Sequence, residues 1–306
     1  MGSGFRIGID LGGTKIEAAA LDRDGRVALS RRVATPVGDY SLTVAAIVDL
    51  VGAIERELLI KAPVGVGIPG AISPRTGLVK GANSTCLIGR PLKEDLEEAL
   101  ERPLRLMNDA NCFALSEAEG GAGKGRETVF GVILGTGVGG GVVIGGRVLA
   151  GLNAIAGEWG HNPLPSPTPD EIPGPLCWCG RRGCVETFLS GPALAADHRR
   201  HGGESLSPQE IAAASRKGEE ACRATLERYA ERLARALAAV VNLLDPQVIV
   251  LGGGLSEIAL FYERVPPLLP RHVFSDFVDT EILPPVYGAA SGVRGAAFLW
   301  PPESAA

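Results

Sequence analysis

The sequence has no uncharged apolar run of the length that crosses a membrane. Such a span needs about 18 consecutive apolar residues, and Asp10 interrupts the first apolar run of the chain. The opening residues, Met1 to Arg6, also lack the architecture of a secretory signal peptide. We therefore expect a cytoplasmic protein without a membrane partner.

An excess of basic residues is also absent. Lys and Arg total 30 against 35 Asp and Glu, which gives a formal net charge of -5. A nucleic-acid-binding protein is expected to present a basic face, so this balance argues against a nucleic-acid partner.

Two common nucleotide-binding motifs are absent as well. The P-loop motif Gly-x4-Gly-Lys-Ser/Thr is missing. Two Gly-x-Gly-x-x-Gly matches, at Gly65 and Gly135, are not followed by a helical pattern and so fail as dinucleotide-binding fingerprints.

Glycine, by contrast, is abundant, with 42 residues in a chain of 306. The excess falls in short clusters beside apolar runs, which favours tight backbone turns around a ligand. A strand, glycine turn, strand pattern opens at Phe5 and recurs at Thr128. Elsewhere strands alternate with helices, which predicts an α/β protein with mixed sheets in two halves.

The periodicity of apolar residues predicts the individual elements. We expect strands at 5–10, 16–21, 27–33, 64–68, 104–107, 128–134, 142–144 and 247–251. We expect helices at 41–59, 91–100, about 109–119, 225–244 and 291–299.

The first glycine turn, Asp10-Leu-Gly-Gly-Thr-Lys15, has the composition of a phosphate-binding loop. Gly12 and Gly13 would let the backbone approach an anion closely. Thr14 offers a hydroxyl donor and Lys15 a positive charge, whereas Asp10 would repel phosphate and better suits a hydrated Mg²⁺. The alternative is a hairpin turn that is merely rich in glycine.

Two further glycine clusters allow similar interpretations. Gly135–Gly141 follows a predicted strand and resembles a second phosphate loop. Gly252–Gly254 follows a buried strand and could admit a base or a ribose, and the alternative there is a tight strand-to-helix turn.

Asn108 and Asp109 stand between a predicted strand and a predicted helix. Ligands of α/β sheets bind beyond the carboxyl ends of strands, where Asp109 could accept a proton from a substrate hydroxyl. The same position suits a helix N-cap, and position alone favours the cap.

Three cysteines crowd into Cys177-x-Cys179-x4-Cys184, and His161 precedes them. Together they form a Cys₃His set suited to a closed, tetrahedral Zn²⁺ site, with a redox pair as the alternative. Cys86, Cys112 and Cys222 lie in apolar contexts and are expected in the core. The histidines His198, His201 and His272 lie in charged or loop-like stretches and are expected to be solvated.

These motifs, taken together, resemble the ROK sugar kinases. The resemblance is carried, in the family's order and over nearly the whole chain, by 10–15, 108–109, 157–161, 177–186 and 252–254. Within the family, segments 83–85, 108–112, 157–165 and 291–297 look most like the fructokinase/mannokinase branch.

The resemblance implies the actin-like ATPase (ribonuclease H-like) fold, with two lobes of mixed sheets around a central cleft. A small lobe would comprise 1–118 and about 291–306, and a large lobe 119–290 with the zinc-binding loop. It also implies a homodimer. The expected activity is ATP-dependent phosphorylation of fructose to fructose 6-phosphate, with mannose as a second substrate.

The resemblance also assigns roles to residues. Asp109 would be the general base. The sugar would be bound by Asn83, Asn108, Asp109, Glu158, His161 and Glu186. ATP and its Mg²⁺ would be bound by Gly8, Asp10, Gly12, Gly13, Thr14, Lys15, Gly135, Thr136, Gly137, Gly139, Gly253 and Gly254. His161, Cys177, Cys179 and Cys184 would hold a structural Zn²⁺. The effect of the proline-rich loop 166–175 on substrate choice is left open.

Three alternatives stand beside fructokinase. The first is a glucokinase or N-acetylhexosamine kinase of the same family. Such an enzyme would differ from a fructokinase in which polar groups of the sugar site stay hydrogen-bonded to the substrate. A sugar-sensing regulator of this family would carry a helix-turn-helix before the first glycine loop, and Asp10 comes too early to leave room for one. A zinc-stabilised binding or redox protein would leave Asp10, Lys15 and Asp109 without a role.

Overall fold

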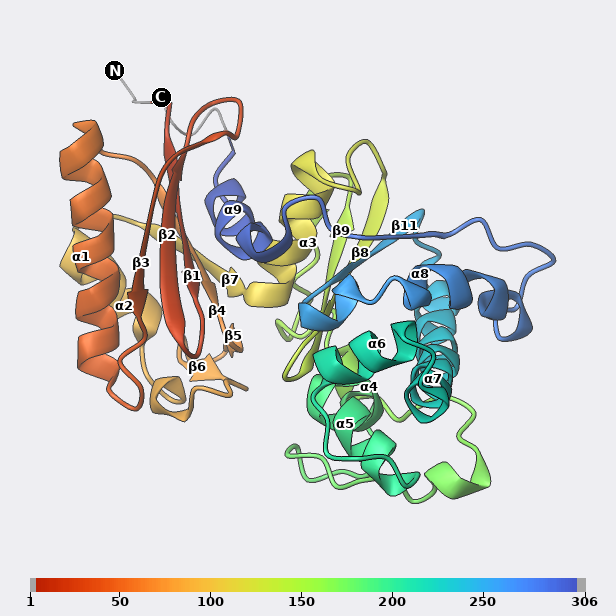
Figure 1. The fold of residues 1–306 in the computed structure, drawn as a ribbon. Helices are drawn as coiled ribbons and strands as arrows, with labels where there is room; N and C mark the ends of the chain where they lie inside the picture. Colours follow the sequence, from red (N-terminus) through yellow and green to blue (C-terminus); the bar gives the residue numbers. More distant parts are fainter. Residues whose placement is uncertain (1–3, 302–306) are drawn as a thin grey trace. The chain divides into compact units, whose positions relative to one another are not determined.

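The computed structural model describes residues 4–301, which fold into two compact units (Figure 1). Unit 1 comprises the described residues within 1–124, 141–156 and 289–306, and unit 2 comprises Gly125–Gly140 and Gly157–Gly288. Within residues 4–301, no helix is both long and apolar enough to span a membrane. The lobe boundaries expected near residues 118 and 291 stay a prediction.

Unit 1 is built on a five-stranded mixed sheet with the strand order β3-β2-β1-β4-β7. Its strands are β1 (Arg6–Leu11), β2 (Lys15–Leu21), β3 (Val27–Ala34), β4 (Val64–Ile68) and β7 (Leu104–Asn108). The first three form an antiparallel meander, whereas β1, β4 and β7 run parallel. The mixed sheet predicted from the glycine turns is therefore confirmed. A small ribbon of β5 (Ala71–Ile72) and β6 (Val79–Lys80) accompanies it.

The two faces of this sheet are covered by different helices. Alternate residues of β2 divide between the faces, as the period of a strand requires. Ile16, Ala18 and Ala20 join the apolar cluster of α1 (Tyr40–Leu58) and α2 (Leu92–Leu100). Ala19 and Leu21 pack instead with α9 (Ser291–Phe298).

Helix α9 lies unusually close to its neighbours because glycines line its contacts. A Cβ on Gly8 of β1 or on Gly65 of β4 would overlap a carbonyl oxygen of α9. A Cβ on Gly295 of α9 would overlap the carbonyl of Cys112 in α3 (Asp109–Gly120). The start of α9 is fixed as well, since the Ser291 hydroxyl donates to the fully buried Glu117 at 2.7 Å. The chain's last helix thus locks α3 against the sheet.

The second sheet has the strand order β10-β9-β8-β11-β12. Its strands are β8 (Thr128–Leu134), β9 (Val138–Ile144), β10 (Arg147–Val148), β11 (Val248–Gly252) and β12 (Glu281–Leu283). β11 runs parallel to both β8 and β12, and β10 is antiparallel to β9, so this sheet is mixed too. The helices of unit 2 are α4 (Glu186–Leu189), α5 (Gly191–Arg200), α6 (Pro208–Arg216), α7 (Glu220–Leu244) and α8 (Leu260–Arg264).

Most predicted elements are confirmed, and the differences have local causes. β9 begins at Val138, inside the run predicted as a turn, because small residues leave its backbone able to pair. α7 begins at Glu220 rather than 225. α5 and α6 were not predicted; both are short and start at a serine cap followed by proline at the first or second helical position.

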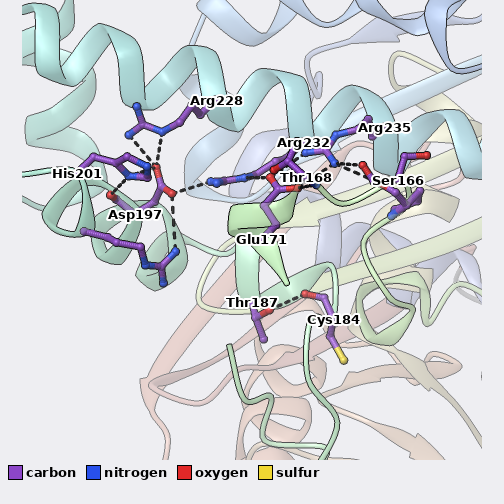
Figure 2. Close-up of polar contacts among 12 residues, drawn as sticks. Ser166, Thr168, Glu171, Cys184, Thr187, Asp197, His201, Arg228, Arg232 and Arg235 are labelled. Atoms are coloured by element: carbon purple, nitrogen blue, oxygen red, sulfur yellow. Dashed lines mark hydrogen bonds and ion pairs between the residues drawn. The ribbon is translucent and has the colours of Figure 1, made fainter. Parts of the chain in front are cut away.

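A buried network of charges ties the proline-rich loop 166–175 to α7 (Figure 2). Glu171 lies in the 3₁₀ helix η3 (Pro169–Glu171) and accepts hydrogen bonds from Arg232 at 2.7 Å and from Arg235 at 2.8 Å. Arg232 also donates to Asp197 of α5 at 2.8 Å, and Arg228 pairs with the same carboxylate. Arg235 further donates to the carbonyl of Ser166 at 2.6 Å. The loop is therefore held by side chains of a long helix.

Acid should weaken this network. Burial favours the protonated form of Glu171, but hydrogen bonds from Arg235 and Arg232 outweigh it and lower the pKa from 4.5 to about 2. A depressed pKa adds stability that is complete above pH 4.5 and is lost as the pH falls towards 2. Glu171→Gln should therefore lower the free energy of unfolding most near neutral pH, with a gap to wild type that narrows below pH 4.5. Urea unfolding at a series of pH values measures this gap.

Glu281→Gln is the matched control, because it breaks an exposed ion pair with Arg126 in the same unit. Exposed pairs contribute only about 0–1 kcal/mol. A gap for Glu171→Gln that stays constant from pH 7 to pH 2 would contradict the assignment.

The close packing of α9 gives a second prediction. Gly295→Ala should lower the free energy of unfolding by about 3 kcal/mol, because the added methyl meets a backbone carbonyl that cannot move easily. Gly52→Ala is the control: Gly52 also lies within a helix, and its added methyl would meet only the flexible end of Arg56. The free energy of unfolding of Gly52→Ala should rise by about 0.5–1 kcal/mol. Equal effects of the two variants in denaturant titrations would refute the packing argument.

Candidate functional site

The first glycine loop is a tight hairpin between β1 and β2. The amide of Gly12 donates to the carbonyl of Lys15 at 3.0 Å, and the Thr35 hydroxyl donates to the Gly12 carbonyl at 2.7 Å. Gly13 and Thr14 are exposed at its tip. The loop is thus a hairpin, as the alternative interpretation held, and its tip is open to a ligand. Gly8 lies farther back in β1, where its contact with α9 accounts for the missing side chain.

Asp10 is the half-buried carboxylate at the base of this loop. Burial raises its pKa to about 6, the Glu17 carboxylate acts in the same direction, and Lys15 opposes both. Lys15 itself pairs with Glu17 at 3.3 Å. On the other side, a Cβ on Gly292 would stand 2.8 Å from the Oδ2 atom of Asp10. A carboxylate in such surroundings is stabilised by a cation, which fits the expected Mg²⁺.

Asn108 and Asp109 stand at the carboxyl end of β7, as predicted. The cap of α3 is Asn108, whose Oδ1 accepts from the Ala110 amide at 2.9 Å and whose Nδ2 donates to the Gly70 carbonyl at 3.1 Å. The alternative of Asp109 as N-cap is therefore wrong, because Asp109 is the first residue within the helix. Asn83 is exposed and follows Ala82, which packs beside Gly70. Asn83 and Asn108 thus lie at the same end of the sheet.

The buried thiol of Cys112 links the two acidic groups of unit 1. Burial raises the pKa of Cys112 well above its usual value, and the charges of Asp10 and Asp109 raise it further. Both carboxylates must lie within electrostatic range of this one side chain. Unit 1 therefore brings Asp10 and Asp109 into range of one thiol, although the sequence separates them widely.

The second glycine loop joins β8 to β9 in unit 2. The Gly135 amide donates to the Gly137 carbonyl at 3.0 Å, and Thr136 is exposed at the tip. The amide of Val138 donates to Oε2 of Glu186 at 2.9 Å. The absence of a side chain at Gly137 leaves room for this carboxylate, because a Cβ would stand 2.7 Å from the same oxygen and would displace it. The carbonyl of Gly139 accepts from the indole of Trp159 at 2.9 Å.

The third glycine cluster borders a cavity in unit 2. Gly253 has a φ of 79°, and a Cβ there would overlap the Leu134 carbonyl, so only glycine fits. Gly254 lines a cavity of about 230 Å³ together with Gln209, Arg216 and Leu255. The cluster is a tight turn, as the alternative interpretation held, and it also lines this cavity.

His161, Cys177, Cys179 and Cys184 bring one ligand atom each into a group whose members all lie within 4.8 Å of one another. Cys177 Sγ is 3.6 Å from His161 Nδ1, and Cys179 Sγ is 3.7 Å from Cys184 Sγ. Metal–sulfur bonds of 2.3 Å at tetrahedral angles place two sulfurs about 3.8 Å apart. Hydrogen bonds from Arg181 lower the pKa of Cys179 to about 6, which favours a thiolate. Four converging donors including an imidazole fit a metal better than a redox pair.

The side chains expected to bind sugar in unit 2 surround this cluster. Glu158 is exposed and leads into the 3₁₀ helix η2 (Trp159–His161). Glu186 begins α4 and accepts a hydrogen bond from the indole of Trp178 at 2.8 Å. Trp178 meets the His161 ring edge to face, with a centroid distance of 5.0 Å. Reasoning from the sequence missed Trp178, although its place between two ligand cysteines was a signal.

One expectation for a single residue was wrong, and a second is confirmed only in part. His198 is buried rather than solvated, and its Nδ1 lies 2.9 Å from the Thr225 hydroxyl because α5 packs on α7. Cys86 is only partly buried and packs against the edge of the core, whereas Cys112 and Cys222 are buried as predicted.

Known proteins resemble this chain over nearly its whole length. A sequence profile of the ROK family matches residues 6–303. An N-acetyl-D-glucosamine kinase of Vibrio cholerae is 40% identical over 296 residues, which cover 95% of this chain and 98% of that protein. The solved ROK hexokinase of Thermus thermophilus is 32% identical, with a TM-score of 0.84 over 96% of each chain.

A second solved structure is a ROK family glucokinase from Streptomyces griseus in complex with glucose and AMPPNP. It is 29% identical, with a TM-score of 0.80 over 96% of this chain and 98% of that one. The actin-like ATPase fold expected from the motifs is thereby confirmed. The chain belongs to the ROK family.

Proposed function

We propose that this chain is an ATP-dependent sugar kinase whose substrate is N-acetyl-D-glucosamine. The observation that supports this most is the match at 40% identity to an N-acetyl-D-glucosamine kinase, over 98% of that protein. Fructose, the substrate favoured from the sequence, has no support among these relatives. Glucose is the second candidate, because the solved relative from Streptomyces griseus is a glucokinase at 29% identity.

In the proposed reaction a sugar hydroxyl attacks the γ-phosphate of ATP. Asp109 takes the proton of that hydroxyl, and its place at the end of β7 leaves the carboxylate at the rim of the sheet. Phosphoryl transfer otherwise needs positioning and neutralisation of charge. The exposed tips of the two glycine loops, at Thr14 and Thr136, would supply donors to the phosphates. Asp10 would hold the Mg²⁺, which neutralises phosphate charge.

Beside Asp109, five polar side chains would bind sugar hydroxyls. Asn83 and Asn108 belong to unit 1, and Glu158, His161 and Glu186 to unit 2. The cavity beside Gly254 would receive the nucleoside. The homodimer stays a prediction from the family resemblance, and the cytoplasmic location stays a prediction from the sequence.

The Cys₃His group fits Zn²⁺, which would be held by His161, Cys177, Cys179 and Cys184. Four protein ligands close a tetrahedral site, so the metal would stabilise the loop rather than activate water. With Nδ1 of His161 facing the cluster, the imidazole proton stays on Nε2 and can be donated to a sugar hydroxyl.

A coupled assay of ADP release with Mg-ATP tests the proposal on N-acetylglucosamine, glucose, mannose and fructose. We expect N-acetylglucosamine to have the highest kcat/KM, by about tenfold or more, which corresponds to about 1.4 kcal/mol. A higher kcat/KM for glucose would show that glucose is the substrate instead.

Asp109→Asn should lower kcat by about 10²–10⁴ while the circular dichroism spectrum stays unchanged. Near-normal turnover of Asp109→Asn would show that Asp109 is not the general base.

Metal analysis tests the cluster independently of the substrate. The purified protein should contain one zinc per chain, and Cys179→Ser should lose it, because one of four ligands is removed. The KM for sugar should rise in that variant as the loop around His161 loosens. Cys86→Ser, which alters a half-buried cysteine outside the cluster, is the control and should keep the metal. Full zinc occupancy in Cys179→Ser would contradict the ligand set.

A further inference from the structure

We propose that Trp178 is a positioning residue of the sugar site, which acts by fixing the carboxylate of Glu186. The inference rests on the proposed function, in which Glu186 binds sugar hydroxyls. It assigns a role to a side chain that is neither a metal ligand nor one of the expected sugar contacts.

The carboxylate of Glu186 is held from two sides by two different segments. The indole Nε1 of Trp178 donates to Oε1 at 2.8 Å, and the amide of Val138 donates to Oε2 at 2.9 Å. Trp178 belongs to the metal-binding turn and Val138 to the second glycine loop. A carboxylate oxygen has two lone pairs, so Oε2 keeps one acceptor site for a sugar hydroxyl, whereas Oε1 also lies 4.0 Å from Cys177 Sγ. The two protein donors fix the direction in which that site points.

Trp178 is itself held in place, although 65% of the residue is exposed. Its ring stands edge to face against His161, at a centroid distance of 5.0 Å and an interplanar angle of 81°. The flanking residues Cys177 and Cys179 are members of the metal-ligand group. The backbone closes a turn there, since the Gly180 amide donates to the Cys177 carbonyl at 2.9 Å. The backbone turn, the ring contact with His161 and the hydrogen bond to Glu186 therefore hold this exposed tryptophan in one orientation.

This arrangement connects the two proposed sugar ligands of the metal loop. The His161 imidazole touches the Trp178 ring, and the Glu186 carboxylate receives its N–H, so one indole sets both side chains relative to each other. Loss of the N–H should free the carboxylate to rotate. A bound sugar would then have to order it again, which weakens binding of the sugar and leaves binding of ATP unchanged.

The test compares Trp178→Phe with Trp300→Phe by steady-state kinetics and by calorimetric titration of N-acetylglucosamine. Trp178→Phe keeps an aromatic ring but removes the N–H donor, and Trp300→Phe makes the same change of ring size elsewhere. Trp300→Phe removes an indole N–H that donates to the Val64 carbonyl at 2.7 Å, and neither Trp300 nor Val64 is among the residues proposed to bind a ligand. We expect the KM for sugar to rise about fivefold to thirtyfold in Trp178→Phe alone. The KM for ATP and the zinc content should stay at wild-type values.

A double-variant cycle with Glu186→Ala, which removes both carboxylate oxygens, decides whether Trp178 acts through Glu186. If it does, Trp178→Phe should change the KM for sugar less than twofold in the Glu186→Ala background. Effects that multiply in the double variant would overturn the proposal. So would zinc loss in Trp178→Phe, or equal behaviour of the two tryptophan variants. Failure of the proposed function would be seen separately, as absence of sugar phosphorylation by the wild-type protein.

Discussion

The close approach of α9 to β1, β4 and α3 is the constraint on which the rest of unit 1 depends. It is possible only because glycines stand where any side chain would overlap a backbone carbonyl. The consequence reaches the candidate catalytic groups. Gly292 leaves room for the Asp10 carboxylate, and Gly295 packs on the carbonyl of Cys112, about one turn into the helix that Asp109 begins. Helix α9 therefore packs against both the Asp10 carboxylate and the first turn of the helix that Asp109 begins.

Unit 2 positions its candidate residues by polar contacts in addition to close packing. The proline-rich loop 166–175 is anchored through Glu171 to α7, and the turn around Cys177 is gathered by a metal-ligand group. Removing one partner from a buried charge network costs about 3–5 kcal/mol, so such an anchor tolerates little variation. Proline stiffens this loop and arginines of α7 hold it in place. The loop therefore provides a rigid support for the neighbouring segments that carry Glu186 and His161.

Local chemistry explains what could be predicted from the sequence. Strands, glycine turns and the Cys₃His set depend on neighbours in the chain, and each was predicted close to where it lies. Long-range partners were not predicted. Glu171 and Arg232 are 61 residues apart in sequence, and only the fold brings them together. His198 has charged neighbours and yet is buried, because α5 packs on α7 through that side. The choice of sugar is harder still, because hexoses share most of the hydroxyls that such residues bind.

The contacts of Glu186 give the site a further property under the proposed assignment. One of its oxygens accepts the amide of Val138 within the second glycine loop, and the lack of a side chain at Gly137 lets the carboxylate approach. A residue that binds sugar and a loop that binds phosphate would thus share one hydrogen bond. Any sugar that draws this carboxylate out of position must also disturb the loop amide. Because phosphoryl transfer depends chiefly on alignment, a sugar that fits poorly would misalign the phosphates as well, and discrimination would appear in turnover as well as in binding.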